Sequence, residues 1–505
     1  MRMDSVIVIG GGVAGLATAL RLAPLPVTLI AKADLGLQAA TMWAQGGLAA
    51  ALGPDDSPAL HAQDTLKAGA GLSDEGATAR ITAAAPACIA WLERLGTPFD
   101  RNSDGSLALG LEAAHSRRRI AHAGGDASGR AVLETLAAAV RAAPSITLRE
   151  GLRAEALLRS VAGTVIGVAC VSPTGERVDL TGRAVVLATG GLGGLYASTT
   201  NPLGAVGSGL GLAARAGAVL RDMEFVQFHP TAIVCGADPM PLATEALRGD
   251  GATLWNDRGE RFMLGVEGQE LAPRDVVARA IFAEISAGRR VVLDARLEGL
   301  ERRFPQLVAL CRASGIDPVR EPVPVRPAAH YHMGGVKVDA LGRTSLEGLW
   351  ACGEVASTGL HGANRLASNS LVEALACAGW IADDIAGRPL GPPRDYEPAF
   401  VPGPSANRVE IRRLMDAHVG VSREAGGLTA AVRRLDALVR EGDDLALVAL
   451  LVAAAALKRE ESRGGHFRTD FPLPRTPARH ADTTLGETLA LTAGLREAPA
   501  ARRVA

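Results

Sequence analysis

Residues 6–15 read Val-Ile-Val-Ile-Gly-Gly-Gly-Val-Ala-Gly, and small and apolar residues continue to Leu20. The four apolar residues predict a short buried strand, the glycines predict a turn, and the next residues have helical spacing. Together they form a Gly-x-Gly-x-x-Gly motif at the start of a β-α-β unit, with Gly10, Gly12 and Gly15 at its three glycine positions. Because the strand and the helix are both in place, this stretch predicts a dinucleotide-binding site rather than a merely structural turn.

The identity of the dinucleotide depends on the residues beyond the motif. A second strand is expected over residues 27–30, and an acidic residue after such a strand usually binds the ribose of NAD. Lys32 stands near that place instead, which weakens an assignment to NAD. The loop Thr-Met-Trp-Ala-Gln-Gly-Gly at 41–47 is built largely of small residues that allow close approach to a ring system, and it favours a flavin.

Two more apolar strands are expected much further along the chain. The first ends in Ala-Thr-Gly-Gly at 188–191, and the second, within 348–354, ends in Gly-Glu. One dinucleotide held by three segments that are far apart in sequence is the arrangement of flavoproteins with two dinucleotide folds.

Six motifs, in order along the chain, resemble those of the succinate dehydrogenase/fumarate reductase flavoprotein family, and within it those of the L-aspartate oxidases. The resemblance covers residues 6 to about 385, and a weaker match, Glu-Ser-Arg-Gly at 461–464, lies further on. The six motifs are Ala-Gln-Gly-Gly at 44–47, Gln-Phe-His-Pro-Thr at 227–231, Arg-Gly-Asp-Gly at 248–251, Pro-Arg-Asp at 273–275, His-Tyr-His-Met-Gly-Gly at 330–335 and His-Gly-Ala-Asn-Arg-Leu-Ala-Ser-Asn-Ser-Leu at 361–371.

The resemblance implies an α/β fold, with an FAD-binding Rossmann-like domain, an inserted α+β capping domain and a C-terminal helical bundle. It implies FAD-dependent oxidation of L-aspartate to iminoaspartate, with oxygen or fumarate as the electron acceptor. This is the first step of de novo NAD biosynthesis, and quinolinate synthase is the implied partner that receives the unstable imine. Two alternatives stay open: a soluble fumarate reductase or succinate dehydrogenase flavoprotein subunit, and a flavin-binding scaffold without catalysis.

Residues around the flavin are implied by the same resemblance. In relatives that bind FAD covalently, a His precedes the Thr of the 41–47 loop, and Ala40 occupies that place here, so non-covalent FAD is expected. Ser208 stands where the family often has Asp, which puts a carboxylate contact to the cofactor in doubt. The full cofactor set comprises Gly10, Gly11, Gly12, Val13, Ala14, Gly15, Lys32, Ala40, Thr41, Ala44, Gln45, Gly46, Gly47, Ala154, Ala188, Thr189, Gly190, Ser208, Glu354, Ser370 and Leu371.

The resemblance implies a specific role for three of these residues. Glu354 would accept hydrogen bonds from ribityl or ribose hydroxyls. The alternative is a carboxylate at the start of a helix. Ser370 and Leu371, at a helix N-terminus, would direct backbone N–H groups and the positive helix end at flavin N1 and O2, where reduction builds negative charge.

A dicarboxylate held against a flavin needs two cationic or N–H-rich pockets, one for each carboxylate. Arg365 with His330 suits one pocket, and His229, Thr244 and Arg248 suit the other, since the planar fork of Arg binds carboxylates bidentately. Each His taken alone would more often be a structural hydrogen-bonding residue. The substrate-binding set is completed by Gln227, Glu245 and Ser368.

Arg274 is the proton-handling residue that the resemblance implies, and it is catalytic together with His229 and His330. An Arg side chain normally stays protonated, so this role needs a specially arranged site. The alternative is an Arg at a helix N-terminus that pairs with the adjacent Asp275.

Glu112 distinguishes the two candidate substrates. It precedes Ala-Ala-His-Ser-Arg-Arg, where the L-aspartate oxidases have Glu-Gly-Gly-His-Ser and the Glu faces the substrate ammonium. Succinate and fumarate have no ammonium, and a buried carboxylate would repel them. The alternative is a loop carboxylate neutralised by Arg117 or Arg118.

The net charge and the cysteine pattern limit the kinds of partner and metal that the chain can bind. A net charge of -1 and the lack of a basic run argue against nucleic acid. The six cysteines are scattered without a Cys-x-x-Cys pair, which fits reduced thiols in a cytoplasmic protein and argues against a thiolate-held metal. The first strand begins so early that no cleaved signal is expected. Residues 445–457 are apolar but too few to span a bilayer, so a buried helix is expected rather than a membrane anchor.

Changes in sequence character predict the domains. Residues 1–220 and 330–388 are expected to form the FAD-binding domain, with a hairpin over 165–171 and 175–180. Residues 221–329 are expected to form an inserted capping domain, or lid, and 318–327 an extended return path. A Pro- and Gly-rich linker at 387–404 precedes a C-terminal domain over 405–505, with three helices expected at 406–417, 427–440 and 445–462.

Overall fold

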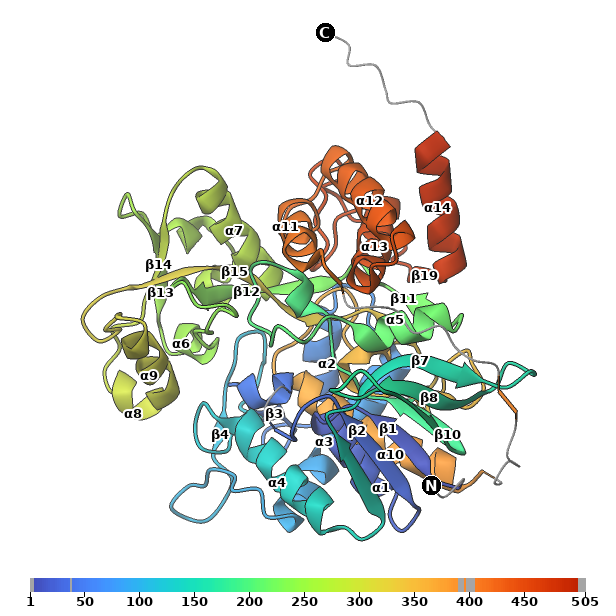
Figure 1. Ribbon diagram of the computed structural model, residues 1–505. Coiled ribbons are helices and arrows are strands. Elements are labelled where there is room, and N and C mark those ends of the chain that lie inside the picture. The colour runs from blue at the N-terminus through green and yellow to red at the C-terminus, as the bar shows by residue number, and fades with distance from the viewer. Residues whose placement is uncertain (1–3, 37–38, 389–394, 397–404, 498–505) are drawn as a thin grey trace.

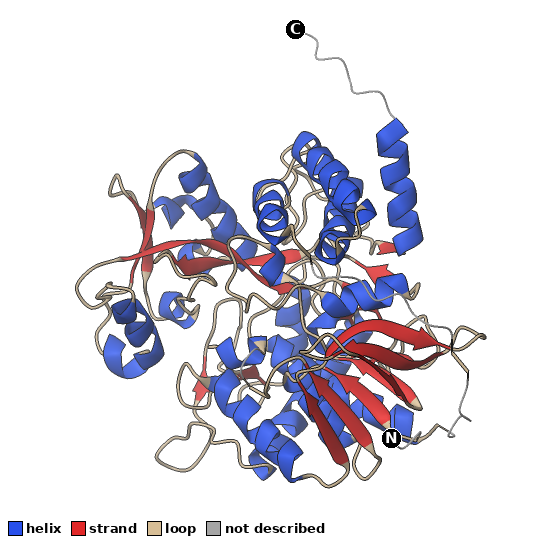
Figure 2. Cartoon of the chain, in the orientation of Figure 1, coloured by secondary structure: helices blue, strands red, loops and turns tan. Residues whose placement is uncertain are grey.

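A five-stranded parallel sheet lies at the centre of the nucleotide-binding part of the chain (Figures 1 and 2). The computed structural model describes residues 4–36, 39–388, 395–396 and 405–497. The sheet has the order β17-β10-β1-β2-β6 and brings together the three segments expected around the dinucleotide. Its strands are β1 (Val6–Ile9), β2 (Val27–Ala31), β6 (Ile146–Glu150), β10 (Ala184–Leu187) and β17 (Leu349–Ala351).

The two faces of β1 belong to different hydrophobic cores, as expected for a strand buried on both sides. Val6 and Val8 pack with the helices on one face, and Ile7 and Ile9 pack on the other, toward a second sheet of order β7-β8-β9. The predicted hairpin is confirmed, because β8 pairs antiparallel with β9. The elements of these layers are α1 (Val13–Arg21), α2 (Pro58–Ala68), α3 (Glu75–Arg94), α4 (Ser128–Ala142), α10 (Asn369–Ala386), β7 (Arg153–Arg159), β8 (Val165–Val171) and β9 (Arg177–Thr181).

The glycine turn after β1 leaves no room for side chains. Gly10 has φ 129°, and a Cβ there would lie 2.0 Å from the Ala188 carbonyl oxygen. A Cβ on Gly15 would lie 1.9 Å from the Gly10 oxygen. The first glycine therefore allows the tight turn and the third allows α1 to pack on the strand, as the motif predicts.

Short strands hold the loops that surround the site. The sheet β3-β5-β4 carries the loop that contains Glu112, and the sheet β18-β16-β11-β19 ties the C-terminal part of the chain to the rest. These elements are β3 (Leu48–Ala49), β4 (Leu109–Gly110), β5 (Ile120–Ala121), α5 (Ser208–Arg215), β11 (Leu220–Arg221), β16 (Gly335–Lys337), β18 (Ala356–Ser357) and β19 (Asp482–Thr483), with 3-10 turns η1 (Ala40–Trp43), η2 (Gly193–Leu195) and η5 (Gly353–Val355).

A separate four-stranded sheet of order β12-β15-β14-β13 carries the capping segment, at the left in Figure 1. The expected return path at 318–327 is extended from Val323 onward, in a strand that continues to His332 and so carries His330. Asp126, from the loop before α4, accepts the backbone N–H groups of Gln306 and Leu307 at the start of α9. The elements are β12 (Val226–Ile233), α6 (Ala246–Gly249), β13 (Thr253–Asn256), η3 (Phe262–Gly265), η4 (Gln269–Leu271), α7 (Arg274–Ser286), β14 (Val291–Asp294), α8 (Leu300–Arg303), α9 (Pro305–Ala313) and β15 (Val323–His332).

The C-terminal part is helical, and it contains a helix that the sequence pattern did not predict. The three expected helices correspond to α11 (Arg408–His418), α12 (Ala425–Arg440) and α13 (Asp444–Lys458), and α14 (Leu485–Glu497) is additional. The expectation of three helices is therefore corrected to four over residues 405–497. Most of the predicted linker at 387–404 lies outside the described residues.

The apolar run at 445–457 forms the buried helix α13, as expected, and α13 packs against α12. In the described part of the chain, no helix combines the length and apolar character needed to cross a membrane.

Candidate active site

A cavity of about 580 Å³ runs along the carboxyl ends of the parallel strands and extends to the capping segment. Ligands of open α/β sheets bind at this edge. The loops after β1, β2, β10 and β17 form one part of its wall, and residues of β12, α7 and α9 in the capping segment form another. The cavity therefore joins the nucleotide-binding and capping parts.

The cofactor residues expected from the sequence lie together on this wall, with one exception. Gly15 is buried in the first turn of α1, where it packs against the Gly10 carbonyl rather than lining the cavity. The lining residues are Gly10, Gly11, Gly12, Val13, Ala14, Lys32, Ala40, Thr41, Ala44, Gln45, Gly46, Gly47, Ala154, Ala188, Thr189, Gly190, Ser208, Glu354, Ser370 and Leu371.

This wall fits a dinucleotide in shape and in chemistry. The N-terminus of α1 opens onto the cavity through the side-chain-free turn at Gly10–Gly12, which suits a pyrophosphate. Thr189 Oγ1 and Gln45 Oε1 are buried and have no hydrogen-bond partner among the described residues. Such groups are expected to be satisfied, so they indicate a ligand that carries hydrogen-bonding groups.

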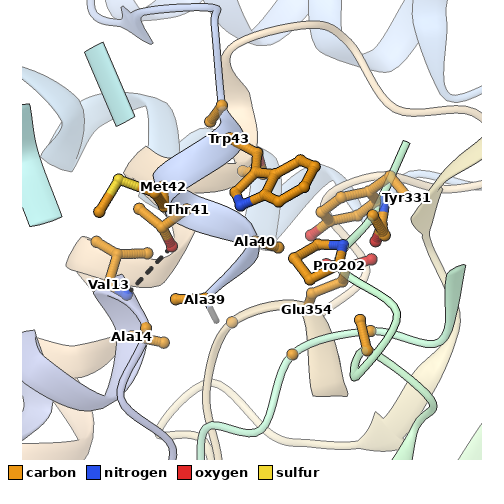
Figure 3. Close-up of a pocket in the computed structure, with 18 of the residues that line it drawn as sticks. Val13, Ala14, Ala39, Ala40, Thr41, Met42, Trp43, Pro202, Tyr331 and Glu354 are labelled. Carbon is orange, nitrogen blue, oxygen red and sulfur yellow. Dashed lines mark hydrogen bonds between the residues drawn. The ribbon is translucent and has the colours of Figure 1, made fainter. Parts of the chain in front are cut away.

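The η1 turn lies opposite Pro202, Tyr331 and Glu354 across the cavity (Figure 3). Thr41 Oγ1 accepts the backbone N–H of Val13 at 3.3 Å, so this loop is attached to the first turn of α1. Ala40 begins η1 and lines the cavity with a methyl group only. The side chain at the expected attachment place therefore has no nucleophilic atom.

Three polar residues of the expected cofactor set, Lys32, Ser208 and Glu354, also line the cavity. Lys32 donates from Nζ to the Gly204 carbonyl at 2.5 Å. Ser208 is the first residue of α5. Glu354 accepts the His332 backbone N–H at 2.9 Å, and burial raises the pKa of its carboxyl to about 7. Glu354 lies in the first turn of η5 without capping it, so the alternative of a carboxylate at the start of a helix stays open.

Gln227 joins the two guanidinium groups of the site. Its Oε1 accepts from Arg274 Nη1 at 3.0 Å and from Arg365 Nε at 3.3 Å. Its Nε2 donates to Asn364 Oδ1 at 2.9 Å and to the Arg365 carbonyl at 2.8 Å. Burial, and then the charge of Arg274, lowers the pKa of Arg365 to about 10, which leaves it protonated at neutral pH. Two adjacent buried cations create a strong preference for an anionic ligand.

Glu245 is the counterion of Arg274. Its Oε2 lies 2.6 Å from Arg274 Nη2, and its Oε1 lies 3.1 Å from Arg248 Nη2. Burial alone would raise the pKa of Glu245, but the charges of Arg274 and Arg248 lower it overall. The alternative pairing of Arg274 with Asp275 is wrong, because Asp275 pairs with Arg279 at 2.8 Å.

Two residues that were expected to bind the substrate lie behind the wall of the cavity and do not line it. Arg248 is fully buried between Glu245 and the carbonyl of Glu270, and Gln227 lies behind Arg274 and Arg365. The expectation that Arg248 contacts a carboxylate directly is therefore corrected: its guanidinium is used by protein groups, and it supports Glu245. Gln227 likewise supports the two guanidinium groups.

His229 and His330 face each other, with ring centroids 5.1 Å apart. His330 Nδ1 lies 2.8 Å from Thr200 Oγ1, and His229 Nδ1 lies 3.3 Å from the Thr231 backbone N–H. Burial, and then the charge of Arg274, holds the pKa of each imidazole well below 6.5. His229 Nε2 has no partner among the described residues and is available to a ligand.

Glu112 lines the same cavity from the opposite domain and is 4% exposed. Its Oε2 accepts from Ser368 Oγ at 2.7 Å, and burial raises the pKa of the carboxyl. The alternative of neutralisation by the Arg run is wrong, since Arg117 instead lies 3.6 Å from Asp55. A buried carboxylate with a neutral partner favours a cationic group on the ligand.

Sequence reasoning missed several lining residues. Tyr331 lies beneath the guanidinium of Arg365, with 4.8 Å from Cζ to the ring centroid, and Thr200 positions His330. Trp43 also lines the cavity. Tyr331 and Trp43 occur inside motifs that were recognised, so their position beside candidate residues was the available signal. Thr200 lies in no such motif.

Comparison with known proteins agrees with this geometry. The FAD binding domain family matches residues 5–371, and the fumarate reductase flavoprotein C-terminal family matches residues 438–500. The chain is 54% identical to the L-aspartate oxidase of Mesorhizobium japonicum over 475 residues, which is 92% of this chain and 91% of that protein. It is 53% identical to the L-aspartate oxidase of Agrobacterium fabrum, over 93% and 91% of the two chains.

Solved structures give the same result for the fold. A quinol-fumarate reductase with menaquinol superimposes with a TM-score of 0.86 at 30% identity, over 94% of both chains. The fold and the site thus define an FAD-binding flavoprotein of the succinate dehydrogenase and fumarate reductase type. Within this class, the identity to curated relatives over more than nine-tenths of the chain is decisive, and the chain belongs to the L-aspartate oxidase family.

The methyl group of Ala40 leads to a prediction about FAD attachment. Acid precipitation of the purified protein is expected to release all of the yellow colour into the supernatant, because no imidazole stands at the attachment place. Absorbance of the supernatant and of the washed pellet measures this directly. Flavin retained in the pellet would contradict the prediction and would point to attachment elsewhere.

Proposed function

We propose that this chain oxidises L-aspartate to iminoaspartate. The hydrogen on Cα leaves as a hydride with the two electrons of the C–H bond. The ammonium nitrogen loses a proton as the C=N bond forms. FAD, when bound, accepts the hydride and later passes the electrons to oxygen or fumarate. The residues of the chain bind the substrate, exclude water and handle protons.

One substrate carboxylate is bound by Arg365 and His330, and the other by His229 and Thr244. Both imidazoles are neutral at pH 7, because burial and the charge of Arg274 disfavour a second cation. They bind as hydrogen-bonding groups, while Arg365 supplies the positive charge. Tyr331 supports that guanidinium from the side, with its ring 4.8 Å from Cζ.

Arg274 handles the proton that the substrate nitrogen releases, and Glu245 is the carboxylate that can accept this proton through Arg274. Glu245 accepts from Arg274 and Arg248 at the same time, so a proton shared with Arg274 has a hydrogen-bonded acceptor 2.6 Å away. The capping segment carries both residues and closes over the cavity, which excludes water from the hydride transfer.

The buried carboxylate of Glu112 is the observation that carries the choice of substrate. Arg365 and the two histidines account for a dicarboxylate, but a plain dicarboxylate gives Glu112 no cationic partner. The ammonium of L-aspartate supplies one. Fumarate shares the carboxylates without the ammonium, so reduction of fumarate by the same site is the second candidate activity, and the fumarate reductase likeness supports it.

The product also needs a recipient. Iminoaspartate hydrolyses readily in water, so its consumption needs an enzyme that accepts it quickly. Quinolinate synthase is the proposed recipient.

The Arg274→Lys variant is expected to bind FAD as the wild type does. Its turnover is expected to fall below about a tenth of the wild-type value. The substitution keeps the charge and loses the planar fork that contacts both Glu245 and Gln227. A tenfold loss corresponds to about 1.4 kcal/mol of transition-state stabilisation. The measurement is L-aspartate oxidation per bound FAD, with Arg290→Lys, on an exposed side chain of the same segment, as the control. Turnover above that level would remove Arg274 from the central role.

Glu112→Gln is expected to raise the KM for L-aspartate about tenfold or more, a step of about 1.4 kcal/mol. The variant keeps size and hydrogen bonding but removes the charge, and the coupling is larger than the ~0.2–1 kcal/mol of an exposed pair because the site excludes water. Fumarate reduction is expected to stay unchanged or improve.

Both activities are measured on one preparation at matched FAD content, with Glu134→Gln on the exposed face of α4 as the control. An equal loss of both activities would mean that Glu112 is structural. The preference for L-aspartate would then lose its physical basis.

A further inference from the structure

Behind Glu112 lies a buried polar network that the proposed chemistry does not use. It consists of His115 and Arg119 from the Glu112 loop, with Asp56 just before α2 and Asp64 within α2. Arg119 is among the largest fully buried side chains of the protein. Burying a guanidinium and an imidazole costs free energy unless both are fully paired, so their pairing is informative.

Two turns meet at this network, and each contains a strained residue. In the first, the His115 backbone N–H donates to the Glu112 carbonyl at 3.2 Å, and Ala114 has φ 65°. In the second, Ser368 has φ 61° at the N-cap of α10. Left-handed backbone is costly for residues other than glycine, and it persists where the surroundings enforce it.

Two hydrogen bonds join these turns side by side. Ser368 Oγ donates to Glu112 Oε2 at 2.7 Å, and His115 Nε2 lies 3.0 Å from the carbonyl oxygen of Ala367, the residue before Ser368. The first bond holds the carboxylate that faces the cavity. The second holds the backbone from which Ser368 makes that bond.

Arg119 determines which nitrogen of His115 carries the proton. Its Nη1 lies 3.4 Å from His115 Nδ1, and a guanidinium can only donate, so Nδ1 accepts and Nε2 carries the hydrogen for Ala367. Burial lowers the pKa of His115 to about 4, so the ring is neutral at pH 7. Asp56 holds Arg119 Nε at 2.8 Å, and Asp64 holds Nη1 at 2.6 Å.

Further contacts fix the second turn from other sides. The Ala49 backbone N–H donates to the Ser368 carbonyl at 3.0 Å. The Asn369 side chain lies between His61 Nε2 at 2.7 Å and Thr65 Oγ1 at 3.0 Å, both on α2. Beside the Ser368–Glu112 bond itself, His115 is therefore the contact that couples this anchored turn to the Glu112 loop.

We propose that His115 is a positioning residue for substrate selection, which orients Glu112 toward the substrate ammonium by holding the Ala367–Ser368 turn. This inference rests on the proposed function for the identity of the ammonium ligand. It predicts a selective effect, because the carboxylate-binding groups of Arg365, His330 and His229 are not partners of His115, whose ring bonds to Ala367 and Arg119. Loss of the His115 donor is expected to weaken binding of an amino dicarboxylate and to leave binding of a plain dicarboxylate unchanged.

Two amide substitutions test the proposal with matched chemistry. In His115→Gln the amide N–H takes the place of Nε2–H and reaches Ala367, whereas in His115→Asn the shorter amide reaches only toward Arg119. His115→Asn is expected to raise the KM for L-aspartate about tenfold, with the Kd for succinate, measured from the flavin absorbance of the holoenzyme, within twofold of wild type. His115→Gln is expected to stay within threefold of wild type for both ligands. Arg118→Gln, on an exposed side chain of the same loop, is the control.

Equal weakening of both ligands in His115→Asn would overturn the proposal, and so would identical behaviour of the Asn and Gln variants. If the His115→Asn variant cannot be purified with bound FAD, the apolar His115→Met variant replaces it in the test. The same changes in the KM for L-aspartate and the Kd for succinate are then expected. A wild-type enzyme that does not oxidise L-aspartate would refute the proposed function. The titrations would then report L-aspartate binding from the flavin spectrum and would still test the positioning role.

Discussion

The amide of Gln227 is the contact on which the active site depends. It lies on the first strand of the capping sheet and bonds at once to Arg274 of the capping helix α7 and to Arg365 and Asn364 of the loop before α10. Two guanidinium groups that would otherwise repel each other are held together around one oxygen. The capping segment and the nucleotide-binding sheet are thus joined at the point where the substrate binds.

The charges around this contact are balanced in a way that leaves a place for the substrate. Arg274 is paired with Glu245, and Glu245 is shared with Arg248, so this half of the site is satisfied within the protein. Arg365 has neutral partners among the described residues, including Ser370 Oγ at 3.1 Å and the Tyr331 ring. Glu112 likewise bonds to the neutral Ser368. An amino dicarboxylate completes both, since its carboxylate pairs with Arg365 and its ammonium with Glu112.

Much of the fold could be predicted from the sequence, because it depends on local patterns. The β-branched run before Gly10 and the apolar runs before Gly190 and Glu354 indicate buried parallel strands, and the structure places them next to one another. The helix α14 was missed because Leu485–Glu497 comes after a long polar stretch and lacks the apolar spacing of α12 and α13. The extent of the capping sheet to His332 depends on pairing with Val226, which no local pattern reveals.

The sequence predicted most of the residues that form the candidate site, but it did not predict which residues contact one another there. Five of the six recognised motifs contribute residues to the lining of one cavity, but the hydrogen-bond partners of these residues depend on how distant segments fold together. Ser368 bonds to Glu112 across more than two hundred residues, and Arg248 pairs with Glu245 behind the cavity wall. This chain has Ala113 and Ala114 where the family motif has Gly-Gly, and the backbone angles show what this difference costs. Ala114 has φ 65°, so a glycine in the relatives would relieve strain at this turn.

The central claim is that this site takes electrons from a dicarboxylate that carries an ammonium. The most direct test is anaerobic mixing of the FAD-loaded protein with L-aspartate and, separately, with succinate at the same concentration. The account predicts that L-aspartate bleaches the flavin absorbance, while succinate perturbs the spectrum without bleaching it to the same extent. Bleaching by succinate with no response to L-aspartate would contradict the account and would identify the chain as a succinate or fumarate enzyme.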